Sequence, residues 1–335
     1  METDATKKAV LMLSGGLDSI LAARLVKDQG AELFAVNFLT AFCTCTTKNS
    51  ACLASKKAAD NLGVPLKVFD ITKEYLDVVK NPKHGYGSNM NPCIDCRIFT
   101  FKKAKHYMAE IGASYIVTGE VVDERPMSQR LDTIRLIEKE SGLNDLIVRP
   151  LSAQILKPSL PEREGWLKRE KFLGIRGRGR TPQFALARAL GVEDYPCPSG
   201  GCLLTYEGFA KKVRDLIKYN QFDIRHVRLL KTGRHFRLSA EVKFIVGRDE
   251  KENEKLTTLS GPDDILFDAG SEPGPSGLYV GPADSKDIQK AAAIIAHYLN
   301  KEGGINIEYR QGNGAKKQIL TTPLTGGELA EYRIN

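Results

Sequence analysis

Six consecutive residues near the N-terminus, Ser14-Gly15-Gly16-Leu17-Asp18-Ser19, follow directly on an apolar run. Two successive glycines let the backbone turn tightly, so that several N–H groups point at one anion beside the positive end of the following helix. Ser14 and Ser19 add hydroxyl donors, and Asp18 can hold a magnesium ion that bridges phosphates. The stretch therefore predicts a cradle for nucleotide phosphates, and the alternative is an ordinary strand-to-helix turn capped by serine.

The order of these residues excludes the commonest phosphate-binding loop. No lysine follows the glycines in a Gly-Lys-Ser/Thr arrangement, so the stretch is not a Walker loop. Its spacing resembles instead the PP-loop of the N-type ATP pyrophosphatases. That resemblance implies an enzyme that splits ATP between its α and β phosphates and leaves AMP on the substrate, with Asp18 as a catalytic residue.

Cysteines form a second group of residues with chemical potential. Cys93 and Cys96 are two residues apart beside a helix predicted to begin near Ile98, a position that favours the metal-binding thiolate. Cys197 and Cys202 form another pair in a tight loop. Four thiolates would suit structural zinc, three would suit an iron–sulfur cluster with one open iron, and a redox pair or buried thiols would need no metal. The cysteine pattern leaves these three interpretations open.

Length and composition set the class of protein. A chain of 335 residues has room for two domains, and 42% hydrophobic residues are ample for their cores. No apolar run approaches the length of a bilayer span and the N-terminus does not look like a secretion signal, so we expect a cytoplasmic protein with no membrane partner. Seven cysteines then favour metal, redox or sulfur chemistry over disulfides. For Cys43, Cys45 and Cys52 we expect small buried thiols.

Basic residues are concentrated in one segment. The net charge is +8, and residues 157–188 contain nine Lys or Arg and three Glu. A glycine-rich run at 174–180 is expected to place three arginines on flexible, exposed backbone suited to phosphate contacts. A solvated charged face is the alternative. The expected RNA contacts of this segment are Lys168, Arg169, Arg176, Arg178 and Arg180.

The first third of the chain alternates predicted strands and helices, which is typical of a parallel α/β sheet. Strands are expected at Lys8–Leu13, Leu33–Phe38, Leu66–Asp70 and Tyr115–Thr118, with helices at 18–29, 55–62 and 98–111. Ligands of such sheets bind beyond the carboxyl ends of the strands. The residues expected to gather there and bind ATP are Ser14, Gly15, Gly16, Asp18, Ser19, Asn37, Phe38 and Gly119.

The pattern changes near His226, after a predicted helix at 206–220. Short alternating runs at 241–246 and 278–280, glycine-proline loops, a helix at 287–300 and a strand at 305–310 indicate a smaller α+β domain. We therefore expect two domains, residues 1–222 with the phosphate loop and the cysteine site, and residues 226–335.

Several segments together resemble the 4-thiouridine synthetase branch of the PP-loop tRNA sulfurtransferases: Val117-Thr118-Gly119-Glu120, Ser128-Gln129 and Val148-Arg149-Pro150-Leu151. Asn91-Pro92-Cys93-Ile94-Asp95-Cys96 is also similar to the cysteine site of 2-thiouridine synthetases and cluster-dependent thiolases. In those relatives, two paired cysteines and one distant cysteine hold a [4Fe-4S] cluster. The resemblance implies that Cys93, Cys96 and Cys202 are cluster ligands and catalytic residues, with Cys197 as the substitute for Cys202. Since no N-terminal RNA-binding module and no rhodanese-like tail are found, we expect a cluster mechanism and not a persulfide relay.

The C-terminal part resembles a different family, the RNA-binding module called NFACT-R, over roughly residues 236–318. The similar segments are Val246–Leu256, Pro262–Asp264, Ala291–Tyr298 and Lys316-Lys317. This resemblance implies RNA contacts at Arg248, Lys316 and Lys317, and the alternative is a structural or dimerisation domain.

Together the resemblances imply ATP-dependent thiolation of tRNA. With Mg²⁺ present, a uridine oxygen would attack the α phosphate, pyrophosphate would leave, and cluster-bound sulfide would displace AMP. The expected product is 4-thiouridine at uridine 8, and the expected partners are tRNA, a sulfide source or cysteine desulfurase, and a second copy of the chain. The alternatives are a tRNA 2-thiouridine synthetase, a PP-loop amide-forming ligase and a non-catalytic RNA-binding adaptor.

Overall fold

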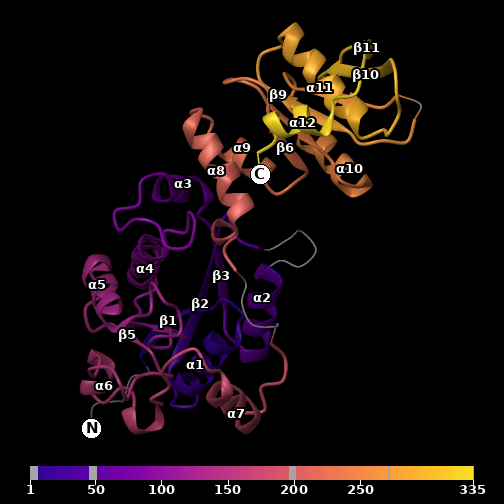
Figure 1. Cartoon of the computed structure of the whole chain (residues 1–335). Coiled ribbons are helices and arrows are strands. Elements are labelled where there is room, and N and C mark those ends of the chain that lie inside the picture. Colours follow the sequence, from indigo (N-terminus) through magenta and orange to yellow (C-terminus); the bar gives the residue numbers. More distant parts are fainter. Residues whose placement is uncertain (1–6, 45–50, 196–200, 271, 335) are drawn as a thin grey trace. The chain divides into compact units, whose positions relative to one another are not determined.

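The structure is a computed structural model that describes residues 7–44, 51–195, 201–270 and 272–334. The chain divides into two compact units, Met1–Thr205 (unit 1) and Tyr206–Asn335 (unit 2), and Figure 1 shows the elements of each. The domain bounds expected from the sequence pattern, 1–222 and 226–335, stay a prediction. Among the described residues, no helix is both long enough and apolar enough to cross a lipid bilayer.

Unit 1 is built on a five-stranded parallel sheet with the strand order β3-β2-β1-β4-β5. The strands are β1 (Lys8–Met12), β2 (Glu32–Leu39), β3 (Leu66–Asp70), β4 (Tyr115–Thr118) and β5 (Ile147–Val148). Met12 at the end of β1 pairs with Val36 of β2 and Thr118 of β4, so the carboxyl ends of the three central strands lie together. The expected fold class, a parallel α/β domain followed by a smaller α+β domain, is confirmed.

Helices cover both faces of this sheet. They are α1 (Leu17–Lys27), α2 (Ala51–Leu62), α3 (Thr72–Lys80), α4 (Cys93–Glu110), α5 (Leu131–Ser141), α6 (Leu160–Arg163) and α7 (Thr181–Ala189). Side chains alternate along a strand, so Ala9 and Leu11 of β1 pack into the core with α1 and α2, while Val10 and Met12 pack into the core with α4. Because both faces are covered, four of the five β1 residues are buried.

The helix expected to begin near Ile98 begins at Cys93, so that part of the prediction is wrong. The Cys96 amide donates to the Pro92 carbonyl at 2.8 Å and closes a first turn. The Asp95 carboxylate in that turn accepts from the backbone amides of Lys83 and His84, at 3.2 and 3.0 Å. These contacts with the preceding loop extend the helix, and the cysteine pair lies in its first turn.

Unit 2 is built on a six-stranded antiparallel sheet with the order β11-β10-β8-β9-β7-β6. The strands are β6 (Arg234–Arg237), β7 (Lys243–Val246), β8 (Ile265–Asp268), β9 (Gly277–Val280), β10 (Ile305–Gln311) and β11 (Lys317–Thr321). The helices are α8 (Glu207–Lys218), α9 (Ile224–Leu229), α10 (Glu250–Leu259), α11 (Ser285–His297) and α12 (Gly326–Tyr332). Apolar residues of α11 pack on one face of the sheet, and Leu256 of α10 packs on the other.

Candidate nucleotide and thiol site

The loop between β1 and α1 has the geometry of an anion cradle. Gly15 has a φ of +80°, and a Cβ at this position would lie 2.6 Å from the backbone of Ala54 at α2. The Ser19 hydroxyl donates to the Gly16 carbonyl at 2.8 Å and lies 3.2 Å from the Ser14 hydroxyl, which is exposed. Glycine is required at residue 15 by both its φ and its close packing, and the loop leaves its hydroxyl side open to a ligand.

The carboxyl ends of β2 and β4 flank this loop. Asn37 of β2 is buried, and its Nδ2 donates at 2.8 Å to the carbonyl just before the loop. A Cβ on Gly119, which follows β4, would lie 2.4 Å from the backbone of Asp18. Phe38 is half-buried and stacks on Phe69 with ring centroids 5.4 Å apart. The structure thus brings the predicted loop residues, Asn37 and Gly119 together at one edge of the sheet.

Asp18 lies in the first turn of α1 with a side chain that is 17% exposed. Its Oδ2 accepts at 3.1 Å from Arg180 Nη2, which also donates at 2.9 Å to Glu124. Burial raises the pKa of Asp18 and the Glu124 carboxylate raises it further, while Arg180 and the Gln183 amide lower it. The other carboxylate oxygen, Oδ1, is buried without a well-formed hydrogen bond in the described part of the chain, so it is suited to a cation.

The three arginines of the glycine-rich run differ in how exposed their side chains are. The expectation that all are exposed is wrong for Arg180, whose side chain is 23% exposed because the carboxylates of Asp18 and Glu124 draw it inward. Arg176 and Arg178 are exposed, and Arg176 pairs with Asp123 at 2.6 Å. Of the other predicted RNA contacts in this segment, Lys168 is exposed and Arg169 bonds Glu162 at 2.7 Å.

Glu120 and Arg149 form a buried ion pair next to this site. Arg149 Nε donates to Glu120 Oε2 at 2.9 Å, Arg97 Nε lies 3.0 Å from Oε1, and Arg149 also pairs with Glu138. Although burial acts to raise the pKa of Glu120, Arg97 and Arg149 lower it below the usual value for glutamate. The pair ties the end of β4 to the segment after β5, so it fixes the strand end on which Gly119 lies.

Three predicted thiols and one further thiol gather near the first turn of α4. Cys202 forms an isolated antiparallel bridge with Cys43, which follows β2. Cys43, expected to be a small buried thiol, is partly exposed. The Cys93 thiol donates to the Ser128 hydroxyl at 3.2 Å. Cys197 and Cys45 lie outside the described residues, and of Cys52 only the backbone, in α2, is described.

The proximity of these thiols is evident in their pKa values. Burial, followed by the neighbouring Cys96, Cys43 and Cys93, raises the pKa of Cys202 to about 12. Burial also raises the pKa of Cys96 to about 11, against a hydrogen bond with the Tyr75 hydroxyl that lowers it. Without a metal these two groups are therefore neutral thiols at pH 7, and a bound metal would have to displace their protons.

The gathered thiols include three candidate ligands for an iron–sulfur cluster. Three sulfur donors, Cys93, Cys96 and Cys202, share one partly buried place, and this donor set suits an iron–sulfur cluster. As the side chains stand, no group of three or more His, Cys, Asp or Glu in residues 7–44, 51–195, 201–270 and 272–334 could hold a single metal ion.

The predicted RNA contacts of unit 2 lie on separate elements. Arg248, just before α10, bonds the Glu252 carboxylate, with Nε at 2.9 Å from Oε2. Lys316 bonds Glu308 at 2.7 Å, and Lys317 at the start of β11 is exposed. Arg248 and Lys316 would have to exchange these carboxylates for phosphates in order to bind RNA.

Sequence reasoning missed two neighbours of the thiols. Cys43 follows β2 at the carboxyl edge of the sheet, and its position after that strand was the available signal. Tyr75 lies in α3, which the sequence pattern did not reveal, and its hydroxyl bonds Cys96.

Sequence comparisons match both units to known families. Residues 7–140 match the model described as the tRNA methyl transferase HUP domain, and residues 233–333 match the NFACT protein RNA binding domain. A tRNA-specific 2-thiouridylase MnmA of Proteus mirabilis is 30% identical over 174 residues, 48% of this chain and 46% of that protein. The enzyme of the same name from Listeria monocytogenes is 21% identical over 73% of this chain and 70% of its own length. The chain spans about half the length of several curated relatives that it matches.

Comparison with solved structures gives weak superpositions. A 4-thiouridine synthetase in complex with RNA and ATP is 21% identical with a TM-score of 0.37, over 67% of this chain and 51% of that one. The U34-tRNA thiolase NcsA from Methanococcus maripaludis with its [4Fe-4S] cluster is 20% identical with a TM-score of 0.34, over 68% of this chain and 72% of that one. The sequence matches therefore show that residues 7–140 are similar to the HUP domain of the tRNA methyl transferase model, and that residues 233–333 are similar to the RNA-binding domain of NFACT proteins.

Proposed function

We propose that this protein is an ATP-dependent tRNA thiolase, which adenylates a uridine oxygen and replaces it with sulfur. The observation that carries the proposal is the loop at residues 119–130. At one end Gly119 lies against the backbone of Asp18, and near the other end Ser128 accepts a hydrogen bond from Cys93 at 3.2 Å. One short loop therefore touches both the phosphate cradle and the thiols, so a single uridine bound there could be activated and thiolated in turn.

The phosphate cradle would carry out the first step. The N–H groups at the start of α1 and the hydroxyls of Ser14 and Ser19 would bind the phosphates, and Asp18 would hold Mg²⁺. The uridine oxygen attacks the α phosphorus, the bond from that phosphorus to the bridging oxygen of the β phosphate breaks, and pyrophosphate leaves with the bond electrons. Arg180, held by Asp18 and Glu124, lies where its charge can stabilise those phosphates.

The thiols would serve the second step. Cys93, Cys96 and Cys202 would hold a [4Fe-4S] cluster, which when bound would supply a sulfide ligand as the nucleophile that displaces AMP. Ser128 orients Cys93 and Tyr75 orients Cys96 through their hydrogen bonds. Cys43, beside Cys202, is available for comparison as a thiol outside the proposed ligand set.

The proposed product is 4-thiouridine, at uridine 8 of tRNA. Its support is the resemblance carried by the Gly119-Glu120 and Ser128-Gln129 segments, both of which are built into the site. The curated relatives are named 2-thiouridylases, so 2-thiouridine is the competing product. Mass spectrometry of the nucleosides distinguishes the two.

Two variants separate the two steps. Asp18→Asn should abolish the release of pyrophosphate but keep the iron and sulfide content of protein prepared without oxygen. Cys93→Ser should lose iron and thiolation but still form AMP and pyrophosphate, and Cys43→Ser is the matched control that should keep its iron. If Cys93→Ser retained full thiolation, Cys93 would have no part in the reaction and the proposed ligand set would be wrong. Ammonia-dependent product formation would instead favour an amide-forming ligase, and failure to release pyrophosphate with any tRNA would favour a non-catalytic adaptor.

A further inference from the structure

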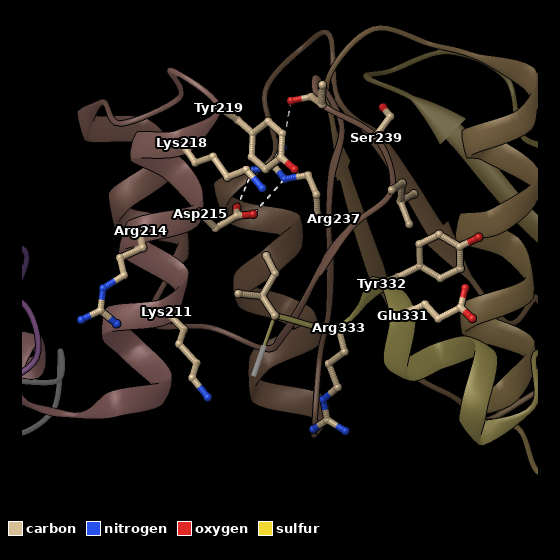
Figure 2. A pocket seen from close by; sticks show the side chains of 13 residues that line it. Lys211, Arg214, Asp215, Lys218, Tyr219, Arg237, Ser239, Glu331, Tyr332 and Arg333 are labelled. Carbon is tan, nitrogen blue, oxygen red and sulfur yellow. Dashed lines mark hydrogen bonds and ion pairs between the residues drawn. The ribbon is translucent and has the colours of Figure 1, made fainter.

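Unit 2 contains a cleft of about 710 Å³ that none of the predicted contacts lines (Figure 2). Its wall is made by one face of α8, by the end of β6 with the loop that follows, and by the end of α12 with Arg333 and Ile334 after it. Five of the lining side chains are cationic and two are acidic, Asp215 and Glu331. The cations are Lys211, Arg214, Lys218, Arg237 and Arg333.

The Asp215 carboxylate in this wall already has its partners. Arg237 Nε donates to Asp215 Oδ1 at 3.1 Å, and Lys243 Nζ donates to Oδ2 at 3.0 Å. The guanidinium of Arg237 also lies 4.5 Å from the centroid of the Tyr219 ring, and Lys218 Nζ lies 5.1 Å from it. Asp215 therefore cannot neutralise the remaining cations of the cleft, because Arg237 and Lys243 both use its charge.

Three of the remaining cations come from α8. Lys211, Arg214 and Lys218 are spaced by three and four residues, so successive helical turns of about 5.4 Å each carry one positive charge, and in Figure 2 the side chains of Lys211 and Lys218 extend toward the cleft while that of Arg214 extends away from it. In Figure 2 the charged ends of Lys211 and Arg333 point to the same side of the cleft, from opposite walls. The partner that Lys211 has, Glu207, is itself 70% exposed, so this ion pair is weak and easily exchanged.

Two buried lysines of unit 2 are disfavoured as cations mainly by burial, and nearby cations add to this effect. Burial and then Arg248 lower the pKa of Lys212 to about 8, and Arg333 contributes in the same direction. Burial lowers the pKa of Lys243 to about 8, opposed by Asp215, and Arg237 and Lys212 act in the same direction as burial. Cations that repel one another in this way favour the binding of an anion, because the anion relieves the repulsion.

We propose that this cleft binds the phosphodiester backbone of RNA and, given the proposed function, that it holds the tRNA substrate. A row of charges with a regular spacing suits a repeating anion better than a single phosphate. The concave shape suits a strand and not a flat membrane surface. Three of the five cations come from α8, which precedes the residues 233–333 matched to the RNA-binding family.

The test compares two charge-matched variants of the full chain. The cleft variant carries Lys211→Ala, Arg214→Ala, Lys218→Ala and Arg333→Ala, and leaves the Arg237–Asp215 pair intact. The control carries Lys251→Ala, Lys255→Ala, Lys286→Ala and Lys301→Ala, which remove four exposed cations of unit 2 that do not line the cleft. Binding of a fluorescein-labelled tRNA transcript is measured by anisotropy between about 50 and 200 mM salt, the range over which phosphate contacts are strongly screened, and circular dichroism verifies that both variants are folded.

The cleft variant should bind tRNA at least about 30-fold more weakly than the wild type, and the slope of log affinity against log salt should fall by about 3, since each lost phosphate contact removes about 0.7–0.9. The control should change affinity by less than about 3-fold, as expected for charges that make no phosphate contact. Equal losses in the two variants would overturn the inference, and so would displacement of tRNA by polyglutamate at equal charge, which would indicate an acidic protein partner. Because binding is measured without ATP or sulfide, a wild-type chain that binds tRNA in the cleft but makes no thiouridine would refute the proposed function and not this inference.

Discussion

Gly119, at the end of β4, lies directly against the backbone of Asp18 in the first turn of α1. A Cβ built on Gly119 would lie 2.4 Å from both the carbonyl carbon and the carbonyl oxygen of Asp18. No side chain fits in this space unless the end of β4 and the start of α1 move apart. The strand end and the phosphate cradle are therefore one rigid assembly.

Gly119→Ala should consequently weaken ATP binding. We expect KM for ATP to rise by about 10-fold or more, because a displacement of about 1 Å at such a site can cost as much as 10²-fold. Gly208→Ala is the control, since a Cβ there meets nothing within 4 Å. An unchanged KM in a folded Gly119→Ala protein would show that the cradle does not depend on this contact.

Arg180 should act on the phosphates and on Asp18 together. Its removal leaves the Asp18 and Glu124 carboxylates without the cation that they share, and takes away a positive charge beside the cradle. We expect Arg180→Ala to lower the rate of pyrophosphate release by about 10²-fold, as for the loss of one charge-stabilising donor, and Arg180→Lys to restore part of it. Arg163→Ala, which breaks the exposed pair with Asp145, should keep the wild-type rate. Equal rates for the Arg180→Ala and Arg163→Ala proteins would rule out this role.

The Glu120–Arg149 pair should dominate the electrostatic contribution to the stability of unit 1. Glu120 is 1% exposed and Arg149 is 3% exposed, so Glu120→Gln leaves two arginines facing a neutral amide and should lower the free energy of unfolding by about 3–5 kcal/mol. Trp166 is the single tryptophan and packs against the core of unit 1, so its fluorescence reports the unfolding of this unit. Asp145→Asn, which breaks an exposed pair with Arg163, should leave the transition nearly unchanged. Similar shifts in the two variants would contradict the assignment.

His235 should make unit 2 less stable in mild acid. Burial, followed by the charges of Lys243 and Lys212, holds the pKa of His235 well below 6.5 in the folded protein. Below pH about 6.5 the unfolded chain binds a proton that the folded chain does not, so the free energy of unfolding should fall by up to about 1.4 kcal/mol per pH unit between pH 6.5 and 5. Urea titrations read by hydrogen exchange in β6 and β7 measure this slope.

A histidine variant identifies the source of that slope. His235→Gln removes the titrating group and should flatten the dependence, while its amide can replace the bond from Nε2 to the Thr232 carbonyl. A slope that survives in His235→Gln would have to come from other groups.

The sequence predicted two of the short strands of the sheet with their bounds. The expected strands Leu66–Asp70 and Tyr115–Thr118 match β3 and β4 to the residue. The helices α3 and α5 were not predicted, and the structure buries Tyr75 of α3 and Ile134 of α5. Such helices gain much of their stability from tertiary packing, which the local sequence pattern does not show.

In the candidate site too, the local sequence predicted some features, and contacts between distant residues could not be predicted. The cradle residues are contiguous, so their geometry could be predicted from the local sequence. The contact between Arg180 and Asp18 joins residues 162 positions apart, and the bridge between Cys43 and Cys202 also spans most of unit 1. These contacts depend on where the later segments of the chain pack at the carboxyl edge of the sheet. The pattern of a single sequence does not contain that information.

The central claim is tested most directly by the products of one reaction. The full chain, prepared without oxygen, is incubated with unmodified tRNA transcript, ATP, Mg²⁺ and sulfide, and the digested tRNA is analysed by mass spectrometry alongside AMP and pyrophosphate. The account predicts 4-thiouridine, AMP and pyrophosphate in equal amounts, and none of the three with Asp18→Asn. Thiouridine formed without ATP, or AMP and pyrophosphate formed with no thiolated nucleoside, would contradict it.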